Sequence, residues 1–156
     1  MKKLFKIMLA LIIIASACKT SSNVAQSENT DGQMDDIVEK YWKLVEINGN
    51  PIAIDNTVSR APFIILKNED KRVNGHGGCN TIAGTYEIDR ATKRIKFSQM
   101  ITTMIACLNM EIEDELKRAL EMADNYALSA DGKYLSLNRA RMAPLARFEL
   151  NVNYEL

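Results

Sequence analysis

The sequence has little of what disulfide-rich, metal-binding and nucleic-acid-binding proteins depend on. Its 156 residues include three cysteines and one histidine, too few for a disulfide-dense scaffold or a zinc ribbon built on paired CxxC motifs. Its twenty basic residues equal its twenty acidic ones, and lysine and arginine cluster only in the first six residues, so we expect no nucleic-acid partner. The length fits one domain with a single hydrophobic core.

The N-terminus has the layout of a secretory signal. Three lysines precede an apolar run at 7–14 that is too short to span a bilayer, and small residues follow at 15–17. A small-residue ending before Cys18 resembles the lipobox of bacterial lipoproteins, in which the cysteine receives the lipid and becomes the acylated N-terminus. An ordinary secreted protein with a stray cysteine is the alternative.

We therefore expect a signal peptide at 1–17, a lipidated cysteine with a flexible linker at 18–36, and a folded domain at 37–156. The linker is rich in Ser, Asn, Asp and Thr and has too few apolar residues to form a core. Cleavage would leave seventeen basic residues against twenty acidic ones. A mildly acidic domain would then be tethered at the bacterial cell envelope. Lys19 lacks the acidic character that retains some lipoproteins at the inner membrane, so we expect the outer membrane, facing the periplasm.

Alternation of apolar and polar residues predicts several short strands. The segments that fit are 41–47, 72–76, 85–88, 94–97 and parts of 126–150. The continuous apolar run at 62–66, which begins at a proline and is followed by a polar turn, predicts a buried strand. The alternation slips at Val45, which predicts a bulge in the first strand.

The period changes to that of a helix at about 109–124. Ile112, Leu116 and Leu120 recur at helical spacing, and Asn109 is the predicted N-cap. The acidic residues at 111–115 match the helix dipole, which gives them a structural explanation. The predicted fold class is mainly β (α+β), a small curved or barrel-like antiparallel sheet capped by this amphipathic helix.

The segment 73–88 holds four of the seven glycines, the single histidine and one cysteine. Glycine reaches positive φ or lets another backbone approach closely, so this segment predicts a tight turn between two strands. The glycines do not match a phosphate-binding loop, because they lack its Lys-Ser/Thr ending and do not open a helix. Asn80 is expected to pin the turn through hydrogen bonds to nearby amides.

Three motifs follow one another along the chain. They are Trp42-x-Leu44, then Gly75-x-x-Gly78-Cys79-Asn80-x-x-x-Gly84-x-Tyr86, then Thr102-Thr103-Met104-x-Ala106-Cys107 followed by Glu111. Together they resemble the META domain of HslJ-like bacterial envelope lipoproteins, over about 41–150. The resemblance implies a small β-rich, barrel-like fold with a helix, often lipidated, sometimes heat- or drug-responsive, and without an assigned reaction. The structural motif residues are Trp42, Gly75, Gly78, Asn80, Gly84, Tyr86, Thr103, Met104 and Glu111.

Cys79 and Cys107 are a disulfide candidate, because thiols oxidise outside the cytoplasm, and the alternative is two buried free thiols. With His76 they also supply three soft ligands for zinc or copper, but a closed structural site needs four. Cys79 beside His76 suggests nucleophilic catalysis, although no orienting group or oxyanion hole can be read. We therefore predict no catalytic residue, no metal and no cofactor. Trp42 and Tyr86 are interpreted first as core or rim aromatics, with a barrel mouth that holds a small apolar ligand as the alternative. Met100, Met104 and Met110 are interpreted as gap-filling core residues.

The sequence thus predicts a non-enzymatic envelope lipoprotein with a structural, stress-related or partner-binding role. The alternative is a small hydrophobic-ligand or lipid-binding module, or chaperone, that uses the barrel interior. A hydrolase or metal-binding protein based on His76 and Cys79 is the third hypothesis. The expected partners are the membrane, through the N-terminal lipid, and an envelope protein, with the oligomeric state left open.

Overall fold

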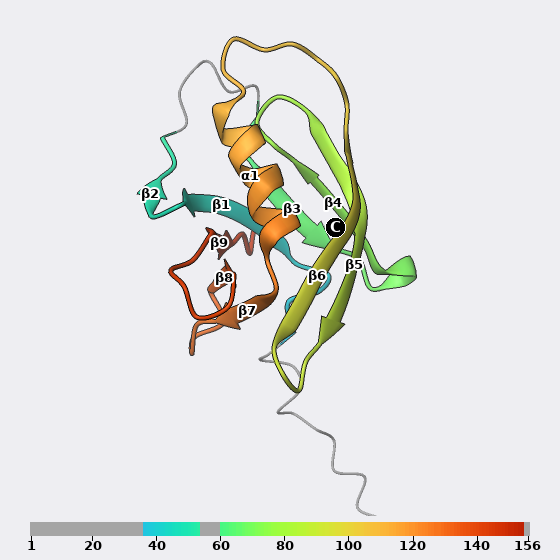
Figure 1. The fold of residues 1–156 in the computed structure, drawn as a ribbon, viewed down its shortest axis with the longest axis vertical. Coiled ribbons are helices and arrows are strands. Elements are labelled where there is room, and N and C mark those ends of the chain that lie inside the picture. The colour runs from blue at the N-terminus through green and yellow to red at the C-terminus, as the bar shows by residue number, and fades with distance from the viewer. Residues whose placement is uncertain (1–35, 54–59, 155–156) are drawn as a thin grey trace, which may run out of the picture.

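The structure, a computed structural model, describes residues 36–53 and 60–154. The predicted signal peptide, Cys18 and all but the last residue of the predicted linker lie outside these ranges. The described chain forms a nine-stranded antiparallel sheet and one α-helix (Figure 1). No helix in these ranges has the length and apolar character needed to cross a bilayer.

Neighbouring strands in the sheet are mostly neighbours in the sequence. The strands are β1 Tyr41–Ile47, β2 Asn50–Pro51, β3 Phe63–Leu66, β4 Arg72–His76, β5 Thr81–Asp89, β6 Arg94–Thr102, β7 Asn125–Leu128, β8 Tyr134–Asn138 and β9 Ala146–Leu150. Helix α1 (Glu111–Met122) connects β6 to β7, and a short 3-10 turn, η2 (Glu69–Lys71), precedes β4. Strand β1 pairs with β3 on one side and with β9 on the other, so the last strand of the chain lies beside the first.

The mainly β architecture and the capping helix agree with the sequence-based prediction. The register of β1 against β9 shifts between Leu44 and Glu46, so the bulge predicted at Val45 is confirmed. Helix α1 is two residues shorter at each end than predicted. Its N-cap is Met110 rather than Asn109, which lies one residue earlier, and the Oδ1 of Asn109 accepts the N–H of Glu111 at 3.0 Å.

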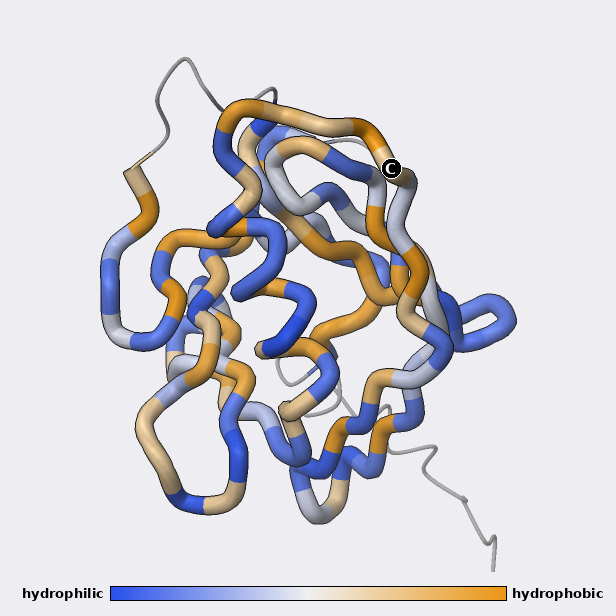
Figure 2. Tube along the Cα trace, turned by 45° about the horizontal axis from the view of Figure 1, so that its top comes forward, coloured by the Kyte–Doolittle hydropathy of each residue, from blue (hydrophilic) through white to orange (hydrophobic). Residues whose placement is uncertain are grey.

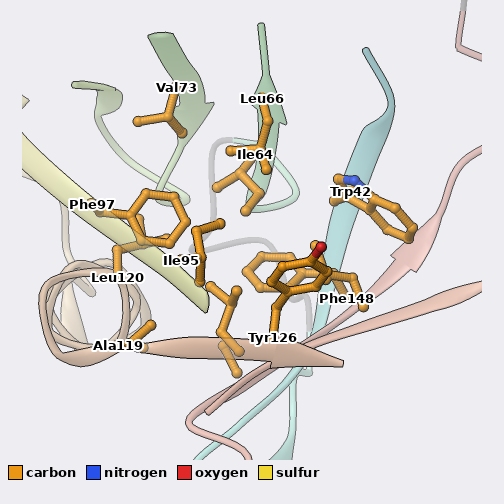
Figure 3. Close-up of a cluster of buried hydrophobic side chains, with 14 of the residues drawn as sticks. Trp42, Ile64, Leu66, Val73, Ile95, Phe97, Ala119, Leu120, Tyr126 and Phe148 are labelled. Carbon is orange, nitrogen blue, oxygen red and sulfur yellow. The ribbon is translucent and has the colours of Figure 1, made fainter. Parts of the chain in front are cut away.

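Side chains fill the space inside the curved sheet. Trp42, Tyr86 and Phe148 are among the largest fully buried side chains. Figure 3 shows Trp42 and Phe148 on the same side of this core as Tyr126, while Phe97 of β6 lies near Leu120 of α1. Burial of apolar surface contributes roughly 25 cal/mol per Å², so this packing is the main source of stability. It also argues against the alternative that the interior holds a ligand.

Helix α1 covers a gap in the sheet. In the described part of the chain, β6 and β7 are paired only at Arg94 and Asn125, so most of this edge of β6 has no strand beside it. The buried face of α1 presents Leu116 and Leu120 to the core next to this gap. Among the described residues α1 makes no backbone hydrogen bond to β6, so the helix covers the core beside this edge without pairing with it.

The loop before α1 and the start of the described chain lie at opposite ends of the molecule. The loop 103–110, which joins β6 to α1, lies at the top of Figure 1, and the turn of the β5–β6 hairpin lies at the bottom. Asp36, the first described residue, forms an ion pair of 3.0 Å with Arg90 in that hairpin turn. The chain therefore enters the domain at the end opposite to the loop.

Trp42 is expected to make a large single contribution to this core. It is fully buried, and its Nε1 donates a hydrogen bond to the carbonyl of Ile37 at 2.8 Å. Trp42→Phe removes that bond and leaves unfilled volume, so we expect the free energy of unfolding to fall by about 2–3 kcal/mol. Urea unfolding followed by far-UV circular dichroism measures it. Tyr134→Phe, at an exposed position of β8, is the control, with an expected change within about 0.5 kcal/mol.

Candidate interaction site

The turn between β4 and β5, at 77–80, is built around the carboxylate of Glu113 from α1. Its Oε2 accepts the backbone N–H of Cys79 at 3.2 Å and that of Asn80 at 2.6 Å. Its Oε1 accepts the side-chain amide of Asn80 at 2.8 Å. Glu113 is only 4 % exposed, and burying a carboxylate is costly unless hydrogen bonds compensate it. These bonds therefore hold the helix against the turn.

Two glycines make room for this arrangement. A Cβ at Gly77 would lie 2.4 Å from the Cγ of Glu113, so any side chain there would displace the glutamate. Gly78 has a φ of +117°, a conformation that residues with a Cβ rarely adopt. The other two motif glycines, Gly75 and Gly84, lie within β4 and β5 rather than in the turn.

The side chain of Asn80 joins the turn to the loop 103–110. Its Oδ1 accepts the hydroxyl of Thr103 at 2.7 Å and the N–H of Ile105 at 2.8 Å, and its Nδ2 donates to the carbonyl of Ile105 at 3.0 Å. Thr103 Oγ1 in turn accepts the N–H of Thr81 at 3.2 Å. The amide group of Asn80 thus bonds to Ile105 much as a neighbouring strand would.

A disulfide adds a covalent link between the same two segments. Cys79 and Cys107 are joined with an S–S distance of 1.98 Å and a Cα–Cα distance of 6.1 Å. In this state Cys79 has no thiolate, so it offers neither a nucleophile nor a metal ligand. In residues 36–53 and 60–154 no group of three or more His, Cys, Asp or Glu residues is placed to bind a metal ion.

The acidic residues of α1 do not share one role. Glu111 is exposed, whereas Glu113 reaches the turn. The sequence pattern indicates only a helix-dipole role for Glu113, and that explanation is incomplete. The available signal was its spacing, because Glu113 lies three residues before Leu116 and seven before Leu120, on the buried face of the helix.

The loop 103–110 exposes large apolar side chains. Met104 is 99 % exposed and Leu108 is 96 % exposed, with Ile105 and Ile101 exposed next to them. The prediction that Met104 fills the core is therefore wrong, because its neighbours Thr103 and Ile105 make the inward contacts. Figure 2 shows hydrophobic stretches along this loop. The bonds at 103, 105 and 107 hold the loop in place while the residues between them face solvent.

A second group of rings lies on the outer face of β1, β3 and β4. The rings of Tyr41 and Phe63 stack with centroids 4.4 Å apart, and the ring of His76 is parallel to that of Phe63 at 6.5 Å. The Arg60 guanidinium lies 4.7 Å from the centre of the Phe63 ring. The Nδ1 of His76 accepts the N–H of Gly78 at 3.1 Å, so this histidine also contacts the turn.

Burial lowers the pKa of His76 below its ordinary value, and the positive charge of Arg60 lowers it further. The negative charge of Glu113 acts in the opposite direction and is the smallest of the three effects. His76 is thus favoured in its neutral form, which accepts the hydrogen bond from Gly78.

The comparisons with known proteins agree with this architecture. The META domain family matches residues 35–152. The chain belongs to the META domain family. An NMR structure of a protein from Burkholderia xenovorans superposes on this META domain with a TM-score of 0.61 at 17% sequence identity, covering 78% of this chain and 88% of that one. A crystal structure of a DUF4847 family protein from Bacteroides vulgatus ATCC 8482 gives a TM-score of 0.51 at 18% identity, covering 80% and 99%. At these identities the likeness shows the fold alone. No curated protein matches the chain.

We expect Glu113→Gln to destabilise this META domain by about 2 kcal/mol, because the amide loses the negative charge that three donors share. Glu111→Gln is the matched control, since Glu111 is exposed on the same helical turn, and its effect should stay within about 0.5 kcal/mol. Urea unfolding of both variants gives the comparison. Equal stability of the two variants would show that the buried carboxylate is not what holds the turn.

His76 is the only histidine, so its NMR titration is unambiguous. We expect a pKa below 6.5, which Arg60→Gln should raise by removing a nearby positive charge. Arg72→Gln, on the same strand as His76, is the control and should leave the pKa unchanged. Because folding lowers this pKa, the contribution of His76 to stability is complete above the unfolded value of about 6.5 and decreases as the pH falls through the folded pKa.

Proposed function

We propose that this chain is a non-enzymatic lipoprotein of the bacterial envelope, held through a lipid on Cys18, whose META domain binds a partner protein. The observation that carries this proposal is the loop 103–110, which presents Met104 and Leu108 to solvent while its backbone is fixed from within. Clustered exposed apolar side chains are typical of interaction surfaces.

The fixed backbone supports a binding role for the loop. Ordering a flexible segment upon binding costs free energy, and a segment that the fold already holds avoids most of that cost. Asn80 bonds to the N–H and the carbonyl of Ile105, and the disulfide fixes Cys107. The apolar residues are therefore presented in a set geometry.

The position of the loop suggests which side the partner approaches from. The described chain begins at Asp36 beside Arg90, at the end of the domain opposite to the loop. A lipid anchor that precedes residue 36 would join the domain at the end away from the loop, so attachment to the membrane would leave the loop accessible. A protein of the envelope is then a better candidate partner for this loop than that bilayer, and a stress-related role would act through such a partner.

The test uses the full chain in cells. Cys18→Ala should move the protein from the membrane fraction to the soluble fraction, because no acyl chains remain to partition into lipid. In the lipidated protein, a photo-crosslinking residue at position 108 should give one discrete product that Met104→Ser abolishes. The matched control is a crosslinker at Met142, an exposed methionine in the β8–β9 connection, which should give no product. Membrane recovery of the Cys18→Ala variant would contradict the tether, and equal crosslinking at 108 and 142 would contradict the binding surface.

A further inference from the structure

The loop 103–110 and α1 enclose a groove of about 300 Å³. One wall is the end of β6 and the start of the loop, and the other is the first half of α1. The lining residues that matter here are Met104, Ile105, Met110, Asp114 and Lys117. The groove therefore has apolar walls and a charged rim on the helix side.

The loop side of the groove has free backbone groups. Thr103 and Ile105 direct their N–H groups inward, to Thr81 and to Asn80. In an extended segment alternate backbone groups point to opposite sides. Among the described residues the N–H groups and carbonyls of Met104 and Ala106 have no hydrogen bond, and β6 has no strand beside this part of its edge. This arrangement is that of an exposed sheet edge, which pairs readily with an extended chain.

The charges at the rim are mainly negative. Of the three charged residues that line the groove, Glu113 and Asp114 are acidic and Lys117 is basic, and Glu111 and Glu115 lie within one helical turn of Asp114. An acidic rim next to apolar walls favours a ligand that combines cationic and apolar groups.

We propose that this groove binds an extended peptide segment of the partner, with alternating apolar and basic side chains, as an added strand on the backbone of Met104 and Ala106. The inference rests on the proposed function and specifies the partner segment. Main-chain hydrogen bonds to the free edge would supply affinity, and the apolar walls and acidic rim would supply preference among side chains.

The test measures fluorescence anisotropy with short labelled synthetic peptides on the folded, disulfide-bonded protein. A peptide of alternating leucine and lysine should bind at least about tenfold more tightly than one of alternating leucine and glutamate. The leucine-lysine peptide with N-methyl groups on alternate amides should lose at least about tenfold in affinity if the methylated amides face the groove, because it cannot pair as a strand. Two methylated peptides are measured, one for each set of alternate amides (the two methylation phases), and the tighter-binding one is the internal control. These measurements leave the protein itself unchanged.

Two variants then locate the binding. Asp114→Lys should weaken the leucine-lysine peptide by roughly threefold to tenfold. The matched charge reversal Glu121→Lys lies near the other end of α1 and should change the affinity by less than about twofold.

Four outcomes would overturn the proposal. They are the absence of binding, equal binding of the two peptides, no effect of N-methylation in either phase, and the same effect of both charge reversals. If any of these results is obtained while crosslinking at position 108 is still observed in cells, the partner-binding role stands and only the groove is rejected. Loss of that crosslinking together with normal peptide binding would reject the proposed function instead.

Discussion

The buried carboxylate of Glu113 is the interaction on which the arrangement of this end of the molecule depends. It brings together a helix, the β4–β5 turn and, through Asn80, the loop before the helix. A carboxylate removed from water requires hydrogen-bond donors, and the turn supplies them only when residues 77–80 have their observed conformation. Displacing any one of the three segments would therefore leave polar groups of the other two unpaired, which makes the assembly cooperative.

This requirement explains why the loop 103–110 does not fold its apolar side chains inward. Its inward-facing positions are already occupied by polar bonds and by the disulfide of Cys107. Its intervening residues must therefore face solvent, although Met104 and Leu108 are as hydrophobic as many core residues. Clustered exposed apolar side chains of this kind are the feature on which the proposed partner-binding role is based.

Most of the fold could be predicted from local sequence patterns. Alternation placed most of the strands and even the bulge at Val45, because most strands bury one face and the pattern records which face it is, whereas β3 is buried on both faces. The helical period of Leu116 and Leu120 placed α1 for the same reason. The site was predicted less well. Glu113 and Asn80 lie 33 residues apart in the sequence, and no local pattern pairs them. The hydrophobicity of Met104 predicts a core position and gives no sign that the neighbouring residues Thr103 and Ile105 are held by Asn80.

The sequence by itself determined the helix, the position of the tight turn and most of the strands, because these follow from side-chain periodicity and from the conformational freedom of glycine over a few residues. It did not determine β2, the start of β5 at Thr81 or the end of β6 at Thr102. Only the tertiary structure decided which acidic residue of α1 is buried, which apolar residues remain exposed and which strand edge stays free. Those outcomes depend on the distance and direction between segments that are far apart in the chain. A carboxylate becomes a structural centre only where folding places the donors of a distant turn around it.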